Sequence, residues 1–214
     1  MRTRRAGTAV TLAIGLALLA AAWLGPLPRL ARESFAAHMT LHMTIVAIVA
    51  PLLALAMAGT RLDPARAAPG LFAPIPASLL ELVAVWAWHA PALHHAARTE
   101  GPAFVLEQAT FLVAGLVLWL AAVGGDVALR PTRRAAGIFA LLFTAMHMTL
   151  LGVLLALAPR ALYAHTGAGA LADQHLGGVL MLLLGGASYL AGGLWLTTGV
   201  VREGSRAVVA GKAT

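Results

Sequence analysis

The sequence predicts an all-α fold, a polytopic membrane helix bundle with about six transmembrane helices and both termini in the cytoplasm. Composition is the first observation: 60% of the 214 residues are hydrophobic, 11% are charged, and the mean hydropathy is +0.86. Soluble domains are roughly 45–50% apolar and about a quarter charged. A soluble fold of this size could not bury so much apolar surface, so we expect residues 1–214 to form a single membrane domain.

The second observation is the length of the apolar segments, because a helix needs about 20 mostly apolar residues to cross the hydrocarbon core. Six segments qualify: approximately 6–24, 35–57, 77–97, 103–123, 135–158 and 175–200. Proline and glycine stand between them, as expected for connecting loops. The first segment also suits a signal peptide, because Arg2, Arg4 and Arg5 precede it; its length favours a retained helix. Its removal would leave five helices.

The third observation is the distribution of positive charge, because cytoplasmic loops of membrane proteins are enriched in Lys and Arg. With a cytoplasmic N-terminus, 11 of the 15 Lys and Arg residues fall on the inner side. The net charge of +7 is scattered between apolar runs and forms no basic domain, so we expect no nucleic-acid partner.

On this topology all eight histidines map to the outer half of the membrane or to its outer surface. They are His38, His42, His89, His94, His95, His147, His165 and His175. Ionisable groups inside a membrane are costly and usually face the bundle interior or a functional site. We expect His94, His95 and His165 to reach the membrane interface instead.

Two histidine and methionine clusters indicate a metal site. His38 and His42 are four residues apart and share one face of a helix, and Met39 and Met43 form the adjacent column. The second cluster is Met146-His147-Met148. The chain has no cysteine, so a soft metal would be bound by imidazole nitrogen and thioether sulfur, and thioethers select Cu(I).

The predicted ligand set is therefore drawn from these two clusters and one further histidine. It comprises His38, His42, His147, Met39, Met43, Met146 and Met148, with His89 as an additional candidate. Glu107 and Asp173 lie on the same side and are expected to orient the ligand imidazoles by hydrogen bonds.

Three functional classes are compatible with such a site. The first is a copper-handling protein that is not an enzyme, since no nucleophile triad, phosphate loop or HExxH pattern occurs. The second is a copper transporter, for which the inner halves of the helices offer little beyond Glu81 and Met57. The third is a b-type heme electron carrier, with His38 or His42 and His89 or His147 as axial ligands.

Five stretches, in the same order, make the sequence similar to the CtaG-type cytochrome c oxidase assembly factors of bacteria. They are 38–43 with 49–53, 86–89 with 91–93, 106–107 with 111–112, 155–163, and 171–178. The chain is shorter than expected for that family. It carries Gln108 where the resemblance leads us to expect His, and His175 where it leads us to expect Gln.

The resemblance implies a role in maturing a heme–copper respiratory oxidase, through the handling of copper for its catalytic centre. It also implies a multi-pass protein of the bacterial cytoplasmic (inner) membrane. The partners expected on this basis are the lipid bilayer, a subunit of the heme–copper oxidase and an extracytoplasmic copper donor.

Overall fold

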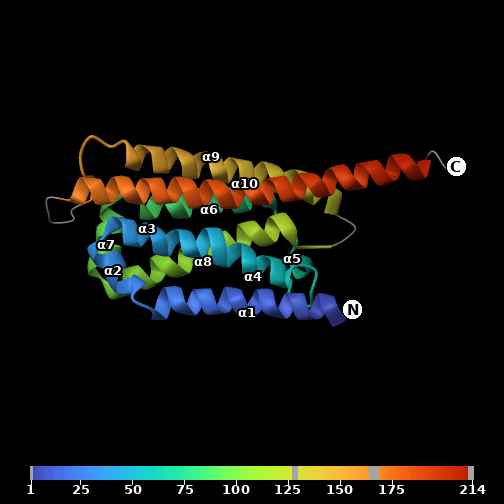
Figure 1. Cartoon of the computed structure of the whole chain (residues 1–214), viewed down its shortest axis with the longest axis horizontal. Coiled ribbons are helices and arrows are strands. Elements are labelled where there is room, and N and C mark those ends of the chain that lie inside the picture. Colours follow the sequence, from blue (N-terminus) through green and yellow to red (C-terminus); the bar gives the residue numbers. More distant parts are fainter. Residues whose placement is uncertain (1, 127–129, 164–168, 212–214) are drawn as a thin grey trace.

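The computed structural model describes residues 2–126, 130–163 and 169–211, and it confirms the all-α fold (Figure 1). Its helices run along a common axis and pack side by side. In chain order they are α1 (Arg2–Leu24), α2 (Leu27–Glu33), α3 (Phe35–Met43), the π-helical η1 (Thr44–Val49), α4 (Ala50–Met57), α5 (Pro64–Ala67), α6 (Pro74–Trp88), α7 (Pro91–Thr99), α8 (Gly101–Val123), α9 (Arg130–Ala156) and α10 (Ala170–Gly211).

Five helices in the described part of the chain are long and apolar enough to cross a membrane. They are Ala6–Leu24, Phe35–Met57, Gly101–Val123, Thr132–Ala156 and Ala170–Arg202. The expected helix over 77–97 is two helices instead, because the chain breaks at His89 and Ala90 before Pro91, and a residue preceding proline disfavours the α conformation. The resulting α6 has 15 residues and is about 22 Å long, shorter than a typical span.

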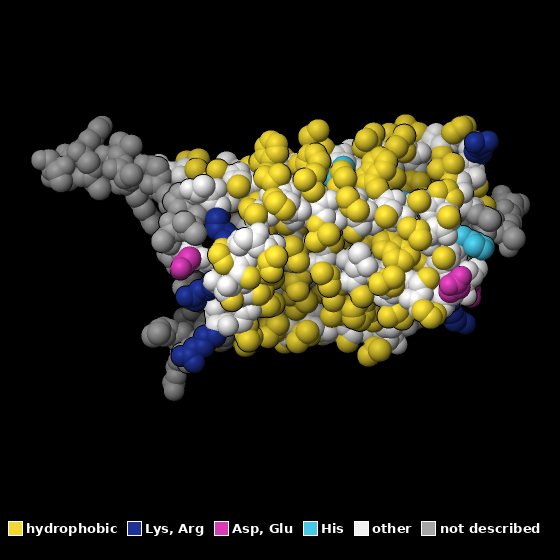
Figure 2. All heavy atoms as spheres, turned by 180° about the vertical axis from the view of Figure 1, so that it is seen from behind, with side chains coloured by type: hydrophobic (Ala, Val, Ile, Leu, Met, Phe, Trp, Pro, Cys, Tyr) yellow, Lys and Arg dark blue, Asp and Glu magenta, His cyan; other side chains and the backbone are white. Residues whose placement is uncertain are grey.

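The two ends of the bundle differ. Figure 1 places α2 and α7 at one end, and both chain termini near the other end. We call the end formed by α2 and α7 the outer end, in keeping with the predicted orientation. Apolar side chains cover the flank between the ends, and the charged side chains visible in Figure 2 gather at the ends. This is the surface expected of a protein surrounded by lipid.

A π-helical segment interrupts the second membrane helix directly below His42. Pro51 has no N–H to donate to the carbonyl of Ala47, four residues earlier, and this loss disturbs the regular α-helical ladder. The hydroxyl of Ser188 on α10 donates to that carbonyl at 2.6 Å. The segment Thr44–Val49 is therefore held against α10, which helps to fix α3 and its histidines.

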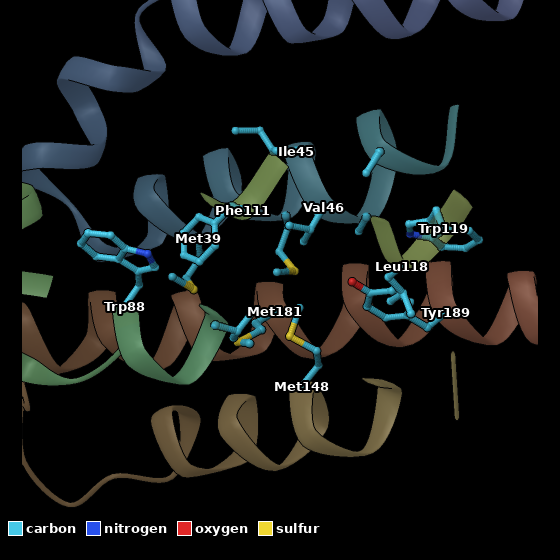
Figure 3. Packing of buried hydrophobic residues seen from close by; sticks show 14 of the residues in the cluster. Met39, Ile45, Val46, Trp88, Phe111, Leu118, Trp119, Met148, Met181 and Tyr189 are labelled. Carbon is cyan, nitrogen blue, oxygen red and sulfur yellow. The ribbon is translucent and has the colours of Figure 1, made fainter. Parts of the chain in front are cut away.

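Glycines bring α9 and α10 into close contact. A Cβ atom at Gly178 would lie 2.5 Å from the backbone nitrogen of Ala156 and 2.8 Å from the carbonyl oxygen of Gly152, so only glycine fits there. The buried core beside this contact is rich in sulfur, and Figure 3 shows Met39, Met148 and Met181 packed within it. Of these two long helices, α10 is the one against which α3 packs.

Candidate metal centre

The start of α3 is fixed by groups from α10. The Asp173 carboxylate accepts hydrogen bonds from the hydroxyl of Ser34 at 2.7 Å and from the backbone N–H of Phe35. The Ser34 hydroxyl accepts from the N–H of Ala37 at 3.1 Å. An acidic group at a helix N-terminus is favoured by the helix dipole. Asp173 thus lies at the first turn of α3, where it sets the position of the helix that carries His38 and His42.

Four imidazoles from three segments meet at the outer end of the bundle. His38 and His42 come from α3, His89 follows α6, and His94 lies on α7; their exposed fractions are 0%, 0%, 5% and 2%. The ring of His38 lies 6.5 Å from His42, 6.3 Å from His89 and 5.1 Å from His94, centroid to centroid. The rings of His42 and His89 are 5.6 Å apart. We call these four residues the histidine cluster.

The break after α6 orients His89 for ligation. Its Nδ1 lies 2.7 Å from the carbonyl oxygen of Val85, which requires that Nδ1 carry the proton and donate. The Nε2 atom is then left with a lone pair, and it is buried without a hydrogen-bond partner in the structure. A carbonyl that fixes the tautomer in this way is a common feature of metal-binding histidines. The backbone carbonyl of His89 accepts a hydrogen bond from the Tyr163 hydroxyl at 2.9 Å.

A buried ion pair borders the histidine cluster. The guanidinium of Arg98 contacts the Glu107 carboxylate, and its Nη1 lies 2.6 Å from Nδ1 of His38. On the other side of that ring, Nε2 of His38 lies 3.6 Å from Oε1 of Glu107. Gln108 donates to Glu107 at 3.0 Å. Burial lowers the pKa of Arg98, and the neighbouring carboxylate opposes this shift.

Aromatic rings enclose the histidine cluster. The ring of Phe111 lies 3.9 Å from that of His42, and the ring of Tyr163 lies 4.2 Å from that of His94. Phe35 stacks on Tyr163 at 4.7 Å. These apolar walls lower the local dielectric, which disfavours protonated imidazoles and keeps the nitrogen lone pairs available.

The donor geometry is close to that of a metal site. One ligand atom each from His38, His94 and Glu107 lie within 4.8 Å of one another. Metal bonds of about 2 Å require donor atoms about 3–4 Å apart, so side-chain movements of about 1 Å would complete the site. The buried Nε2 of His38 and both ring nitrogens of His42 have no hydrogen-bond partner in the structure. A neutral imidazole has one lone-pair nitrogen, so a metal ion could bind one ring nitrogen of His42 and Nε2 of His89. Nε2 of His38 would first have to lose its proton, or the ring would have to turn. With that adjustment the residues fit a metal ion.

A cavity of about 310 Å³ opens beside the histidine cluster at the outer end of the bundle, and His94 is the cluster residue among its lining residues. Its lining includes Arg32 of α2, His94, His95 and Arg98 of α7, and Tyr163. His94 of the histidine cluster and its neighbour Arg98 therefore also form part of the wall of an open cavity. A small ligand in this cavity can contact His94 and Arg98.

Comparison with known proteins gives the family. A family model described as the cytochrome c oxidase caa3 assembly factor matches residues 1–203, nearly the whole chain. The chain belongs to this family. Neither the comparison with curated proteins nor the comparison with solved structures found a match.

The caa3 assembly factor brings only part of the predicted ligand set into the histidine cluster. His38, His42, His89 and Glu107 lie there together. His147 is buried on α9, where its ring lies 5.7 Å from that of Phe143. No ring contact in the described part of the chain joins it to the other histidines.

The predicted methionines lie elsewhere in the bundle. Met39 and Met43 face α10: Met39 packs at Gly177, and the sulfur of Met43 packs at Gly185 beside Met148. Met146 is 70% exposed, on the surface of α9. Their role as copper ligands remains a prediction.

Three residues of the site were not predicted from the sequence. His94 was expected at the interface, but α7 directs it into the cluster. Arg98 was not among the predicted site residues. Gln108 replaces an expected histidine and supports the Glu107 carboxylate, whereas His175 bonds the carbonyl of Ala158 at 2.9 Å. One feature of the sequence could have indicated the ion pair. Arg98 and Glu107 are nine residues apart, on two helices joined by a short turn. His165 lies outside the described residues.

Proposed function

We propose that this caa3 assembly factor binds Cu(I) in the histidine cluster and delivers it to the heme–copper oxidase whose assembly it serves. The proposed ligands are drawn from His38, His42, His89 and His94, with Glu107 as a neighbouring carboxylate. The role is one of binding and transfer rather than catalysis. In this proposal the protein works in the bacterial inner membrane, with the outer end facing an extracytoplasmic copper donor and the oxidase subunit.

One observation carries the proposal: four buried imidazoles converge, and ring nitrogens of His38, His42 and His89 have no hydrogen-bond partner in the structure. Leaving a buried polar atom unsatisfied costs about 1–3 kcal/mol, so a cluster of such atoms is a poor way to build a core. A metal ion bound by these nitrogens would recover that free energy.

The charges favour a monovalent metal ion. Glu107 is already paired with Arg98, so the donors that remain are neutral imidazoles. Neutral donors do not offset the charge of a metal ion, and the guanidinium of Arg98 repels Cu(I) less than it repels a divalent ion. Imidazole also binds copper well. The cavity that reaches His94 supplies the accessibility that transfer to a partner requires.

Copper binding tests the proposal directly. The purified protein is expected to take near-stoichiometric Cu(I) from a chromophoric Cu(I) chelator, and the His38→Ala/His42→Ala double variant is expected to take none. His95→Ala is the matched control, because His95 is exposed on the same helix as His94. Undiminished copper binding by the double variant would reject the assignment.

Copper transport is the second candidate, because a further buried polar group lies below the histidine cluster. The Glu81 carboxyl on α6 is fully buried and accepts a hydrogen bond from the Tyr189 hydroxyl at 2.6 Å. Transport predicts Cu(I) uptake into proteoliposomes with a trapped chelator, and loss of uptake in Glu81→Gln. Delivery predicts copper binding without uptake.

The heme alternative is tested by the visible spectrum. A preparation that binds Cu(I) and shows no Soret band supports copper handling. A Soret band lost on replacing His42 or His89 would replace the copper proposal with electron transfer.

A further inference from the structure

The cavity at the outer end carries an excess of positive charge that the copper proposal does not use. Arg32 and Arg98 both line it, together with His94 and His95, and none of the described residues that line it is acidic. Both ion pairs of the site involve Glu107, and within the described residues Arg32 takes part in neither. The mouth of the cavity therefore holds more cations than anions.

The guanidinium groups of Arg32 and Arg98 both lie over the ring of Phe104. The guanidinium carbon of Arg32 lies 5.0 Å from the centroid of Phe104, and that of Arg98 lies 5.4 Å from it. Nη1 of Arg32 also donates to the backbone carbonyl of Arg98 at 3.4 Å. Like charges in such proximity repel each other, and the repulsion is stronger beside a buried site than in bulk water. An anion in the cavity would relieve it.

We propose that the outer cavity binds a carboxylate group through Arg32 and Arg98. Arginine suits this ligand because its planar guanidinium matches the geometry of a carboxylate. The volume of about 310 Å³ is at the lower limit for small-molecule sites, so it admits an acidic side chain or a small free carboxylate.

Carboxylate binding would be coupled to copper binding, and this part of the inference rests on the proposed function. Cu(I) in the histidine cluster adds a second cation beside Arg98, and in the part of the chain that the structure describes Glu107 is the one carboxylate in contact with that guanidinium. A carboxylate in the cavity would balance the added charge. Each ligand then strengthens the binding of the other by the same factor. An acidic partner would consequently prefer the copper-loaded protein.

The test uses the full-length protein in nanodiscs of uncharged phosphatidylcholine. The probe is a short labelled peptide with blocked ends and a single Asp, compared with the same peptide carrying Asn. In copper-free protein we expect the Asp peptide to bind about 10-fold more tightly, in line with a charge-assisted hydrogen bond. Arg32→Gln is expected to remove most of this preference, and Arg32→Lys to restore part of it. Arg29→Gln is the control, because it removes a cation from the same helix outside the cavity lining.

The remaining arms separate the sources of the carboxylate. If acetate binds and the Asp peptide does not, the cavity takes a free small carboxylate, which supports the proposal. Equal binding of the two peptides together with no acetate binding would overturn it, as would an unchanged preference in Arg32→Gln. Stronger competition by inorganic phosphate, with loss of binding in phosphatidylglycerol nanodiscs, would assign the cavity to lipid headgroups instead.

Copper loading is measured separately. We expect copper loading to increase the affinity for the Asp peptide by about fivefold or more, which corresponds to an ordinary coupling free energy. If the protein binds no Cu(I), the proposed function and the coupling fail together, whereas the copper-free arm still decides the carboxylate site. If it binds Cu(I) and the peptide affinity stays constant, the coupling alone is rejected.

Discussion

Nη1 of Arg98 lies 2.6 Å from Nδ1 of His38, so a permanent cation touches the imidazole at the centre of the histidine cluster. The hydrogen bond requires Nδ1 to be the acceptor, because a guanidinium can only donate. A neutral His38 must then carry its proton on Nε2, the atom that faces Glu107 at 3.6 Å. Copper binding at Nε2 would displace that proton or rotate the ring, and Arg98 therefore controls how readily His38 acts as a ligand.

Removing Arg98 is expected to destabilise the protein strongly. Arg98→Ala leaves the fully buried Glu107 carboxylate without its cation, and breaking a buried ion pair in this way costs about 3–5 kcal/mol. The free energy of unfolding in detergent measures the effect. Arg29→Ala, which removes an exposed arginine, is expected to change it by no more than about 0.5 kcal/mol. The Arg98→Met/Glu107→Leu double variant should lose less free energy of unfolding than Arg98→Met and Glu107→Leu lose together as single variants. Additive losses would contradict the pairing.

The two methionines of α3 offer a test of the ligand set. Met39 and Met43 pack against α10, on the face of α3 that carries no histidine. Met39→Leu/Met43→Leu conserves volume and is expected to cost less than about 1.5 kcal/mol per residue and to leave Cu(I) affinity within about twofold. A chelator-competition titration measures that affinity. A loss comparable to that of the histidine double variant would show that thioether sulfur reaches the metal.

Gly178 is expected to tolerate no side chain. Gly178→Ala places a methyl group against the backbone of α9, which cannot move aside cheaply, and overpacking of this kind costs about 1–3 kcal/mol. Gly186→Ala is the matched control on the same helix, because nothing lies within 4 Å of a Cβ there. Alanine at 186 should stabilise the helix by up to about 1 kcal/mol. Thermal unfolding of both variants compares them; equal transitions would refute the close contact.

The buried hydroxyl of Tyr163 is expected to make the stability of the protein depend on pH in the alkaline range. Burial raises the pKa of its hydroxyl above the ordinary value of 10.0. The folded state then holds this proton more tightly than the unfolded state. The contribution of the hydroxyl to the free energy of unfolding is therefore fully present below pH 10 and is lost as the pH rises further. Tyr163→Phe is expected to lower stability by about 1 kcal/mol at neutral pH, by loss of the bond to His89. The difference between the two proteins should shrink above pH 10 in urea titrations; a constant difference would exclude the linkage.

The fold class was predictable from the sequence, because long apolar runs have few alternatives in a bilayer. The spacing of His38 and His42 also placed them correctly on one face of a helix. The same reasoning could not decide which neighbour that face meets. In the structure the histidine column faces α7 and α8, and the methionine column faces α10.

The misplacement of His94 and the failure to predict Arg98 have a common origin in Pro91. The predicted helix over 77–97 placed His94 on a helix leaving the membrane, where an interfacial position is reasonable. The break before Pro91 redirects the chain, so that α7 packs against α8 and presents His94 and Arg98 to His38. Contacts between residues about 60 positions apart depend on this local turn, and hydrophobic periodicity carries no information about them.

The first turn of α1 and the last turn of α10 lie at the end of the bundle opposite α2 and α7, far from the cavity (Figure 1). Affinity tags, fluorescent reporters or fused domains attached at either terminus would sit a full bundle length from the histidines. Immobilisation through such a tag would leave the cavity accessible to a soluble copper donor. Because the cavity is small, the donor and the acceptor would have to bind there one after the other.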